Sequence, residues 1–367
     1  MSKQWKVKLA NACLRLYTKF GSNFKDKGSF DKSREFERIA IFSTTALGDL
    51  MFNTPAIRAI RERYPNAKIT LISSYKNGGL VGTCSYFNNV IYWDHKAKDM
   101  LGVILQLRKN RPQLAVILHS KAPYDILTAI FSGCEYVFKD AYKNDLGGME
   151  QWLTGISIRD RGHLIQRKLD LVGLLGCDAQ NREMFIPVDF PLQQKQPGSI
   201  VVGFQMGASE VLRCWPVGNF IGLAKMLLTL SPDYQIALIG TPKERTIEHE
   251  FMAGLTADEQ RRVVSYIGKT TLPQLLGVIK NMDALVTGDT GPLHLAIALK
   301  TKTVSLFVTA DPQQTGPYQN PELHQVMHVP VEAQQLSEAQ RRQPLSIITS
   351  HEVMARVTQL LGEQPSS

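Results

Sequence analysis

Short apolar runs of strand length alternate with helical patterns twice along this 367-residue chain, and that alternation limits the fold more than any other feature. Strands that alternate with helices form parallel sheets, because each helix returns the chain to the end where the next strand begins. The expected strands span 39–42, 69–72, 90–93, 114–118 and 136–138 in the first half, and 200–204, 235–239, 263–266, 284–287 and 303–307 in the second. The sequence therefore predicts an α/β protein with two doubly wound, Rossmann-like sheets covered by helices.

The chain divides near a stretch that suits neither strands nor helices. Residues 187–198 contain three prolines, several glutamines and a glycine, a composition typical of a linker. We expect a basic amphipathic N-terminal extension at 1–37, a first domain at 38–190, a linker at 191–199 and a second domain at 200–367. With 44% hydrophobic residues, a chain of this length can give each domain its own core.

One junction between a strand and a helix, at residues 286–299, has the features of an anion site. Pro292 suits the first helical position, Gly291 allows close approach, and the unpaired amides of the first turn would point at a negative group. A diphosphate fits best, because Asp289 can accept from sugar hydroxyls and His294 can donate to phosphate oxygens. The alternative is a capped helix in which Asp289 satisfies a free amide, and this segment alone favours neither.

A second junction follows the first expected strand and leaves a carboxylate without a structural task. Asn53 or Thr54 can cap the helix that follows, and Pro55 fits its first position, so Asp49 is not needed as a cap. We therefore expect Asp49 in a loop between strand and helix, where a carboxylate is a candidate for chemistry. A solvated loop aspartate is the alternative, and the matching loop in the other half of the chain favours the functional role.

Four groups of motifs, in order, make the chain similar to a known family. They are TALGDL, NTPAIRAI and KITLI between 45 and 72, QMGAS and RCWP between 205 and 216, IGTPKE at 239–244, and GKTTL leading to DTGPLH between 268 and 294. From about residue 38 to residue 330, the chain resembles the glycosyltransferase family that contains the lipopolysaccharide heptosyltransferases. The resemblance implies the GT-B fold, in which two domains face a cleft, with the donor on the second domain and the acceptor on the first.

The resemblance also implies roles for individual residues. Asp49 would be the catalytic base that takes the acceptor proton, and Asp289 would position the sugar. The other donor-binding residues would be Arg213, Glu244, Thr290, Gly291 and His294, and the acceptor-binding residues would be His119 and Lys121. Arg213, where the family usually has lysine, would contact the diphosphate, and Glu244 would hold the ribose hydroxyls. The alternatives are a solvated arginine, a surface glutamate at a helix start and a structural histidine.

Several motifs that are absent from the sequence narrow the chemistry. No Asp-x-Asp occurs, so the usual metal clamp for a sugar diphosphate has no ligands, and amides and side chains would meet the leaving charge. The five cysteines are scattered and not at metal-ligand spacing, which predicts reduced thiols in a cytoplasmic protein. Walker A, dinucleotide-binding, metalloprotease and serine-hydrolase motifs are also missing, and we expect no cofactor.

The N-terminal segment lies outside the resemblance and is basic. An apolar helical stripe and a neighbouring basic one consist of Trp5, Leu9, Cys13, Leu16 and Phe20, and of Lys8, Arg15 and Lys19. Such a helix can lie on an anionic membrane, and the alternative is a helix packed on its own domain through this stripe. The net charge of +9 also suits an anionic partner, but no nucleic-acid-binding motif accompanies it, so we expect a membrane surface and no nucleic acid.

Together these features predict an inverting, metal-independent glycosyltransferase at the cytoplasmic face of the inner membrane. It would move heptose from ADP-heptose to the inner core of a lipopolysaccharide precursor, and these substrates come from the resemblance alone. Two alternatives remain: a hexosyl- or protein-directed transferase of the same family, and a non-catalytic nucleotide-sugar-binding protein. Asp49 argues against the second, because a pure binding protein has no need of a base.

Overall fold

The computed structural model contains two α/β domains, Met1–Val188 and Asp189–Ser367, each with its own sheet and hydrophobic core. It describes residues 3–25, 27–142, 145–158, 162–193, 195–330 and 337–362. Each domain carries a six-stranded sheet, and all the strand pairings in the described residues are parallel. The prediction of two doubly wound parallel sheets is therefore confirmed.

The sheet of the first domain reverses its strand order at its centre. Its strands are β1 (Arg38–Ser43), β2 (Lys68–Ser73), β3 (Asn89–Tyr92), β4 (Leu114–His119), β5 (Tyr136–Ala141) and β6 (Gly155–Ile158). They lie in the order β3-β2-β1-β4-β5-β6, so the chain proceeds in one direction from β1 to β3 and in the other from β4 to β6. The carboxyl ends of β1 and β4 thus flank a topological switch point, where ligands of such sheets normally bind.

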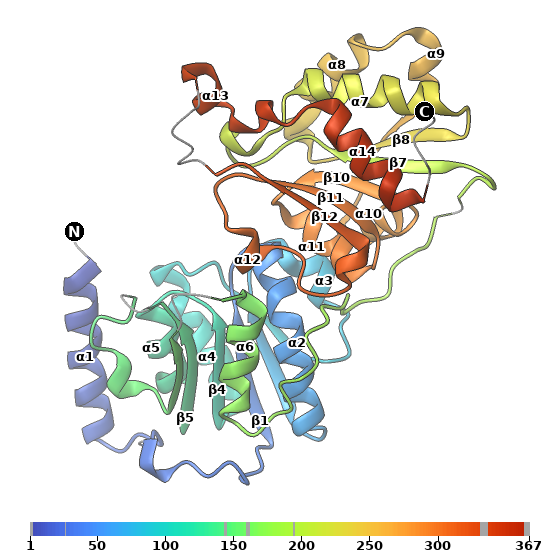
Figure 1. Ribbon diagram of the computed structural model, residues 1–367. Coiled ribbons are helices and arrows are strands. Elements are labelled where there is room, and N and C mark those ends of the chain that lie inside the picture. The colour runs from blue at the N-terminus through green and yellow to red at the C-terminus, as the bar shows by residue number, and fades with distance from the viewer. Residues whose placement is uncertain are drawn as a thin grey trace. The chain divides into compact units, whose positions relative to one another are not determined.

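Helices cover both faces of this sheet. They are α1 (Lys3–Lys19), α2 (Leu47–Arg63), α3 (Gly78–Val81), α4 (Met100–Asn110), α5 (Tyr124–Phe131) and α6 (Leu164–Gly173). Figure 1 shows α2 and α6 side by side on one face and α4 with α5 on the other, with α1 packed against α5. Crossover helices on alternate faces are what a parallel sheet with a central reversal requires.

The second domain repeats this topology. Its strands are β7 (Ile200–Gln205), β8 (Tyr234–Ile239), β9 (Val263–Ser265), β10 (Ala284–Gly288), β11 (Lys302–Phe307) and β12 (His324–His328), in the order β12-β11-β10-β7-β8-β9. Its helices are α7 (Val217–Leu230), α8 (Arg245–Ala253), α9 (Ala257–Gln260), α10 (Leu272–Lys280), α11 (Gly291–Ala298), α12 (Pro312–Thr315), α13 (Glu338–Arg342) and α14 (Ser350–Leu361). Helix α14 returns to pack beside α7, while α10 and α11 pack together (Figure 1). Its switch point lies between β7 and β10.

The sequence prediction missed one strand in each domain, β6 and β12. Both lie at the edge of a sheet. Their side chains are only partly buried, and β12 reads His-Gln-Val-Met-His, which lacks a continuous apolar run. Interior parallel strands are buried on both faces and are therefore recognisable by apolar runs, whereas an edge strand such as β12 can lack one.

Helix α2 begins earlier than the sequence predicted. Its first residue is Leu47, so Asn53 and Thr54 are not its caps, and Pro55 lies inside the helix. The Thr54 hydroxyl donates to the Met51 carbonyl at 2.8 Å. That carbonyl is the acceptor that the missing N–H of Pro55 would otherwise leave unpaired, which explains how the helix accommodates the proline.

Helix α1 packs on the first domain through a face that the sequence analysis did not identify. Val7, Ala10 and Leu14 are buried in its core, and the Asn11 carboxamide oxygen accepts from Trp152 Nε1 at 2.7 Å. The predicted apolar stripe points elsewhere. Its members Trp5, Leu9, Cys13, Leu16 and Phe20 are all exposed. The alternative that this stripe forms core contacts is therefore wrong, although the helix does pack on its domain.

One segment among the described residues, Val211–Leu230, has the length and hydropathy of a membrane span. Helix α7 makes up most of it. Phe220, Leu223 and Leu227 on α7 are buried in the core of the second domain. The apolar character of the segment thus reflects a core helix, since such helices pass the same test of length and composition.

Candidate active site

Asp49 lies beside the switch point of the first domain, in the first turn of α2 and not in a loop as predicted. The loop before α2 is held by buried amides. Asn53 donates to Ser43 Oγ at 2.9 Å, and Asn77 donates to the Thr45 carbonyl at 3.0 Å. These bonds fix where α2 begins. A carboxylate in the first turn also interacts favourably with the helix dipole, so Asp49 is held in a defined place with its charge stabilised.

His119, the last residue of β4, reaches Asp49 across the switch point. Its Nδ1 lies 3.4 Å from Asp49 Oδ1, and 26% of each side chain is exposed. Burial lowers the pKa of His119 well below its ordinary value, and the nearby charges of Lys168 and Lys139 lower it further. The imidazole is therefore neutral at pH 7. Lys121 is exposed two residues later, and no hydrogen bond or ion pair in the described chain joins it to either side chain.

A second histidine at this edge of the sheet had no signal in the sequence. His95 follows β3 with a φ of 59°, a left-handed conformation that is uncommon outside glycine. Its Nε2 makes a short hydrogen bond with Thr44 Oγ1, and its Nδ1 lies 3.4 Å from Ser120 Oγ. Burial lowers the pKa of His95, so this imidazole is also neutral at physiological pH. His95 and the two hydroxyls extend the polar surface beside His119.

In the second domain, the structure brings Arg213 and Asp289 together. Arg213 Nη2 lies 3.1 Å from Asp289 Oδ2 and also donates to the Asp289 carbonyl. The segment that carries Arg213 is anchored by Trp215, which is buried and donates from Nε1 to the Ile348 carbonyl at 2.8 Å. The Trp215 ring also packs edge-to-face on Phe220, with ring centroids 4.7 Å apart. Arg213 is thus a placed cation beside the end of β10 and not a solvated arginine.

The start of α11 offers fewer amides than the sequence suggested. The helix begins at Gly291, so Pro292 takes its second position and not its first. Pro292 has no N–H, and the Leu293 N–H donates to the Thr290 carbonyl at 3.1 Å. These two residues cannot present an amide to a ligand. His294 is buried, and its Nε2 lies 3.6 Å from Asp289 Oδ1. Asp289 therefore faces a cation and an imidazole, and the N-cap residue of α11 is Thr290 and not Asp289.

A buried amide that the sequence analysis passed over organises this loop. Gln205, at the end of β7, accepts at Oε1 from Thr287 Oγ1 at 2.9 Å and from Thr290 Oγ1 at 3.0 Å. Its Nε2 donates to the Gly207 carbonyl. Gln205 and Thr287 are both buried, so these bonds satisfy groups that would otherwise be costly to bury. The sequence does contain a signal for these contacts, because each of two apolar strands has a polar residue at or near its end.

Glu244 has a structural task at the end of β8. It closes a capping box with Thr241, whose N–H donates to Glu244 Oε2. The predicted alternative of a glutamate at a helix start is therefore present in the structure. The same carboxylate lies directly against the backbone of Gly207 and Gly240, where a Cβ would collide with it. Glu244 thus points back to the loops that follow β7 and β8, next to the Gln205 hydrogen bonds.

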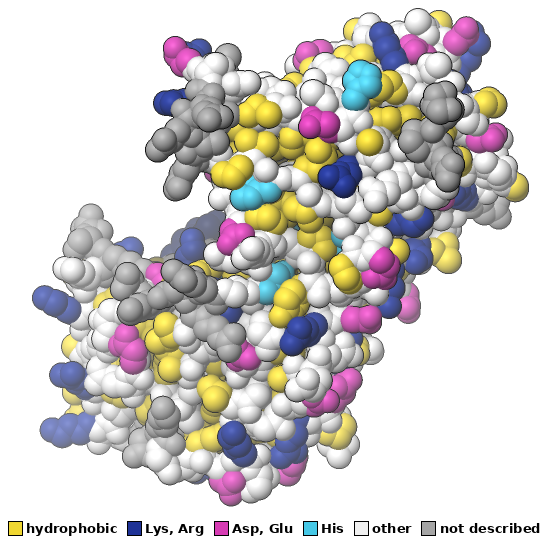
Figure 2. All heavy atoms as spheres, in the orientation of Figure 1, with side chains coloured by type: hydrophobic (Ala, Val, Ile, Leu, Met, Phe, Trp, Pro, Cys, Tyr) yellow, Lys and Arg dark blue, Asp and Glu magenta, His cyan; other side chains and the backbone are white. Residues whose placement is uncertain are grey.

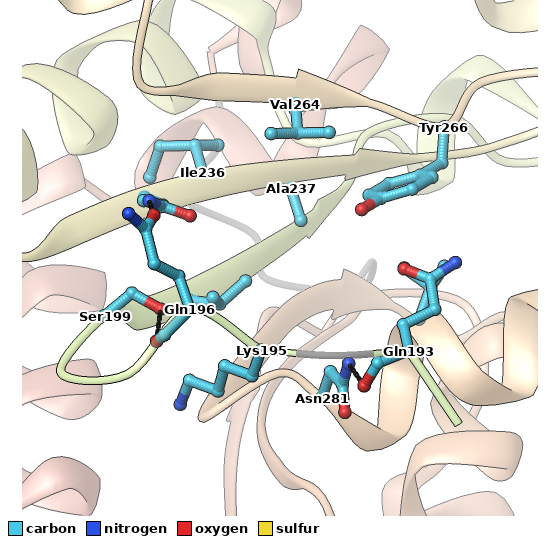
Figure 3. A pocket seen from close by; sticks show the side chains of 12 residues that line it. Gln193, Lys195, Gln196, Ser199, Ile236, Ala237, Val264, Tyr266 and Asn281 are labelled. Carbon is cyan, nitrogen blue, oxygen red and sulfur yellow. Dashed lines mark hydrogen bonds between the residues drawn. The ribbon is translucent and has the colours of Figure 1, made fainter.

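A separate pocket in the second domain contains none of the predicted site residues. Figure 3 shows it against β8, with Gln196, Ile236 and Tyr266 around it. Gln235 Nε2 donates to Gln196 Oε1 at 3.0 Å. The pocket lies against the amino-terminal half of β8, which runs from Tyr234 to Ile239, because Ile236 and Ala237 line it. Ligands of open parallel sheets bind at the opposite, carboxyl edge, so this pocket is not the candidate site.

The matches with known proteins identify the family of this chain. Residues 162–345 match glycosyltransferase family 9, described as heptosyltransferase. The chain is 32% identical to lipopolysaccharide heptosyltransferase 2 of Escherichia coli strain K12 over 306 residues, which cover 76% of this chain and 85% of that protein. The chain belongs to the heptosyltransferase family. It is therefore a glycosyltransferase of the family that builds the lipopolysaccharide core.

Solved structures identify the fold. The ADP-heptose lipopolysaccharide heptosyltransferase II of Escherichia coli superposes with a TM-score of 0.71 at 21% identity, covering 88% of this chain and 98% of that one. An Escherichia coli heptosyltransferase with ADP-2-deoxy-2-fluoro heptose superposes with a TM-score of 0.68 at 15% identity, covering 88% and 99%. Two parallel-sheet domains of this kind are the GT-B fold, as the resemblance implied.

Proposed function

We propose that this heptosyltransferase moves heptose from ADP-heptose to the inner core of a lipopolysaccharide precursor by an inverting reaction without a metal ion. The observation that supports this most is the position of Asp49, a carboxylate at a switch point that faces a neutral imidazole. In the proposed step, the acceptor oxygen bonds to the anomeric carbon of the donor and gives its proton to Asp49. The bond from that carbon to the diphosphate breaks, and ADP leaves.

The second domain is proposed as the donor site. One of the two similar Escherichia coli proteins is named an ADP-heptose heptosyltransferase, and the other is described with ADP-2-deoxy-2-fluoro heptose. In this chain, Arg213 supplies a cation beside the start of α11, where a diphosphate would also meet the positive end of the helix dipole. Thr290, Gly291 and His294 lie in that turn. Glu244, turned toward the loop after β7, is proposed to receive the ribose hydroxyls through the oxygen that is not used in its cap.

The acceptor is proposed to bind at the switch point of the first domain. His119 and Lys121 follow β4 there, and His95 adds a polar edge that the sequence did not suggest. Lys121 is exposed and can approach a large anionic acceptor without losing an existing partner among the described residues. An acceptor hydroxyl bound between these side chains would lie within reach of Asp49.

Inversion is proposed because the donor-site carboxylates are already committed. Asp289 pairs with Arg213, and Glu244 closes its capping box, so neither is available as the nucleophile that a retaining, two-step reaction needs. A single displacement by the acceptor hydroxyl needs only a base on the acceptor side. Asp49 fits that requirement, and a single displacement inverts the configuration at the anomeric carbon.

We propose that the reaction needs no metal ion, because other groups in the donor site supply positive charge. Within the described residues, no group of three or more His, Cys, Asp or Glu side chains is arranged to hold a metal ion. Arg213 and the helix dipole supply positive charge where a divalent cation would otherwise be needed to stabilise the leaving diphosphate. This arrangement favours catalysis by side chains and backbone amides.

We also propose that α1 holds the enzyme on the cytoplasmic face of an anionic membrane. The helix carries five lysines and arginines and no acidic residue, and basic side chains project along it in Figure 2. Its exposed stripe places Trp5 and Leu16 beside this basic face, while its other apolar face is used in the core. A helix with apolar and basic surfaces side by side is suited to the interface between headgroups and acyl chains.

The first prediction concerns the base. Asp49→Asn should keep the affinity for ADP and reduce transfer by about 10²-fold or more, the usual scale for loss of a general base. ADP affinity is measured by calorimetric titration, and transfer by mass spectrometry of the product. Asp99→Asn is the control, because Asp99 is an exposed aspartate at a helix start in the same domain. Near-normal turnover by Asp49→Asn would remove Asp49 from the mechanism.

The second prediction concerns the donor cation. Arg213→Ala should weaken ADP binding by about 1.5 to 3 kcal/mol, the range for a charge-assisted hydrogen bond. Arg261→Ala is a matched control, because Arg261 also pairs with an aspartate, Asp258, but both side chains are exposed. Such surface pairs contribute little, so the control should bind ADP normally. An unchanged dissociation constant for Arg213→Ala rejects its role.

The third prediction concerns metal. Transfer should continue at the same rate in excess EDTA, because Arg213 and the helix dipole meet the charge of the leaving diphosphate. The assay compares enzyme dialysed against chelator with enzyme supplied with magnesium or manganese. A loss of transfer in EDTA that either ion restores would show that the reaction needs a metal.

The fourth prediction concerns the membrane. The double variant Leu9→Gln with Leu16→Gln should sediment several-fold less with vesicles of anionic lipid, because it removes apolar area from the exposed stripe. Leu101→Gln with Leu105→Gln is the matched control, since these α4 leucines are exposed to a similar degree. Deleting 1–22 is unsuitable, because it would also remove Leu14 from the core.

The salt dependence of vesicle binding distinguishes the contribution of the basic face from that of the apolar stripe. Raising the salt concentration should weaken vesicle binding of the unaltered protein, because salt screens the attraction between lysines and anionic headgroups. Binding to neutral vesicles should be weak at both salt concentrations. Equal sedimentation of the two double variants would rule out α1 as the membrane contact.

A further inference from the structure

A cluster of buried charges lies beneath the carboxyl end of β4 and has no part in the proposed reaction so far. Lys139 pairs with Asp125 at 2.6 Å, and Arg167 pairs with Asp140 at 2.9 Å. Lys168 also pairs with Asp140, and all five side chains are at most 4% exposed. Burying charges is costly even when they are paired, so a cluster of this kind needs an explanation.

The two lysines of this cluster bind the backbone on either side of His119. Lys168 Nζ donates to the Leu118 carbonyl, and Lys139 Nζ donates to the Ser120 carbonyl at 2.9 Å. The His119 carbonyl itself accepts from the Thr44 N–H at 3.0 Å. Three consecutive carbonyls are therefore held, two of them by ammonium groups. Hydrogen bonds that involve a charged donor are stronger than neutral ones, so this end of β4 is rigid.

The strand is also irregular at this point. Phe42 of β1 pairs with Ile117 of β4, but the next residue, Ser43, pairs with His119, so Leu118 is an extra residue in the ladder. A bulge changes the face to which the following side chain points, and such bulges are frequent beside active sites. The carbonyl of the extra residue is the one that Lys168 binds. The buried lysine thus stabilises the irregularity that sets the direction of His119.

The imidazole itself has an incomplete set of partners. His119 Nδ1 is buried, and it has no hydrogen-bond partner of good geometry among the described residues. The acidic atom that it faces is Asp49 Oδ1, at 3.4 Å. Hydrogen bonds between catalytic groups are often long before substrate binds and shorten in the reactive complex. A buried ring nitrogen aimed at a carboxylate is therefore a donor that is placed but not yet engaged.

We propose that His119 is a positioning residue for Asp49: its Nδ1–H donates to Asp49 Oδ1 in the reactive complex, while Lys139 and Lys168 hold the end of β4 that carries it. This inference rests on the proposed role of Asp49 as the base. A hydrogen bond to Oδ1 fixes the plane of the carboxylate and therefore the direction of Oδ2, the oxygen that would take the acceptor proton. It also stabilises the charged form of the carboxylate.

The charges around His119 keep it in the protonation state that this role needs. Lys139 on β5, Arg167 and Lys168 on α6, and His95 after β3 all lower the pKa of His119, in addition to its burial. Asp125 and Asp140 neutralise part of this positive charge, and Asp49 faces the ring from α2. The imidazole is therefore neutral at pH 7. One nitrogen of the neutral ring carries a proton, which is the donor that this role needs.

The test compares substitutions of His119 that keep a hydrogen-bond donor near the position of Nδ1 with substitutions that move or remove it. Asn places its amide nitrogen near the position of Nδ1, whereas Gln places it near that of Nε2. His119→Ala and His119→Gln should lower kcat roughly tenfold, with at most a smaller rise in the acceptor KM from the lost acceptor contact, and His119→Asn should keep most of the activity. In the first two variants, the acidic limb of the kcat/KM profile should move to higher pH by about half to one unit, because a lost hydrogen bond no longer favours the ionised Asp49. His249→Ala, an exposed histidine on α8, is the control.

Three results would overturn the proposal. An unmoved acidic limb in His119→Gln would give His119 a structural role only, and a rise in acceptor KM with kcat unchanged would make it an acceptor contact alone. A loss in the Asp49→Asn background equal to that in the unaltered enzyme would show that His119 does not act through Asp49. If Asp49→Asn alone keeps its turnover, the proposed function itself fails, which is a separate outcome. If the alanine variant does not fold, the comparison of His119→Asn with His119→Gln still tests the proposal. Calorimetric titration with ADP shows whether the second domain is intact in each variant.

Discussion

Both domains depend on one constraint: all their paired strands are parallel, so all the strands of a sheet end at the same edge. That edge gathers the segments that follow the strands, and the reversal of strand order at the centre opens a place where two of these segments diverge. In the first domain the segments after β1 and β4 carry Asp49 and His119. In the second, those after β7 and β10 carry Arg213 and Asp289. The sheet topology alone therefore brings together residues that are 70 or more positions apart in the sequence, Asp49 with His119 and Arg213 with Asp289.

The constraint has a cost, because strand ends at a switch point leave polar backbone groups in the protein interior. The two domains meet this cost differently. The second uses the neutral side chains of Gln205, Thr287 and Thr290, which satisfy one another. The first uses charges, with Lys139 and Lys168 donating to carbonyls of β4 and two buried aspartates pairing with them. Buried charge is the more expensive solution, and it coincides with the domain that carries the proposed base.

The interior strands and the two junctions between strand and helix could be predicted from the sequence, and several contacts at the sites could not. Strands buried on both faces read as apolar runs, whereas β12 alternates in burial at a sheet edge and escaped notice. Local signals placed the start of α2 at Asn53 or Thr54, but Asn53 is buried because its amide binds Ser43, a tertiary contact that spacing does not reveal. The Arg213 to Asp289 pair spans 76 positions, and His95 lies in a loop without a motif. Sequence patterns report local periodicity, and these contacts depend on which strands are neighbours in the sheet.

The different partners of the two aspartates explain why their roles should differ. Asp289 faces the guanidinium of Arg213, a cation that cannot lose its proton in water, so accepting a proton there would sacrifice an ion pair. Asp49 faces an imidazole that its surroundings keep neutral, so a proton accepted there breaks no ion pair with His119. A base must be able to gain a proton and lose it again at little cost, whereas a residue that orients a sugar must keep its charge and its position. The same side chain is thus suited to chemistry in one domain and to binding in the other, because one switch point supplies a neutral partner and the other a permanent charge.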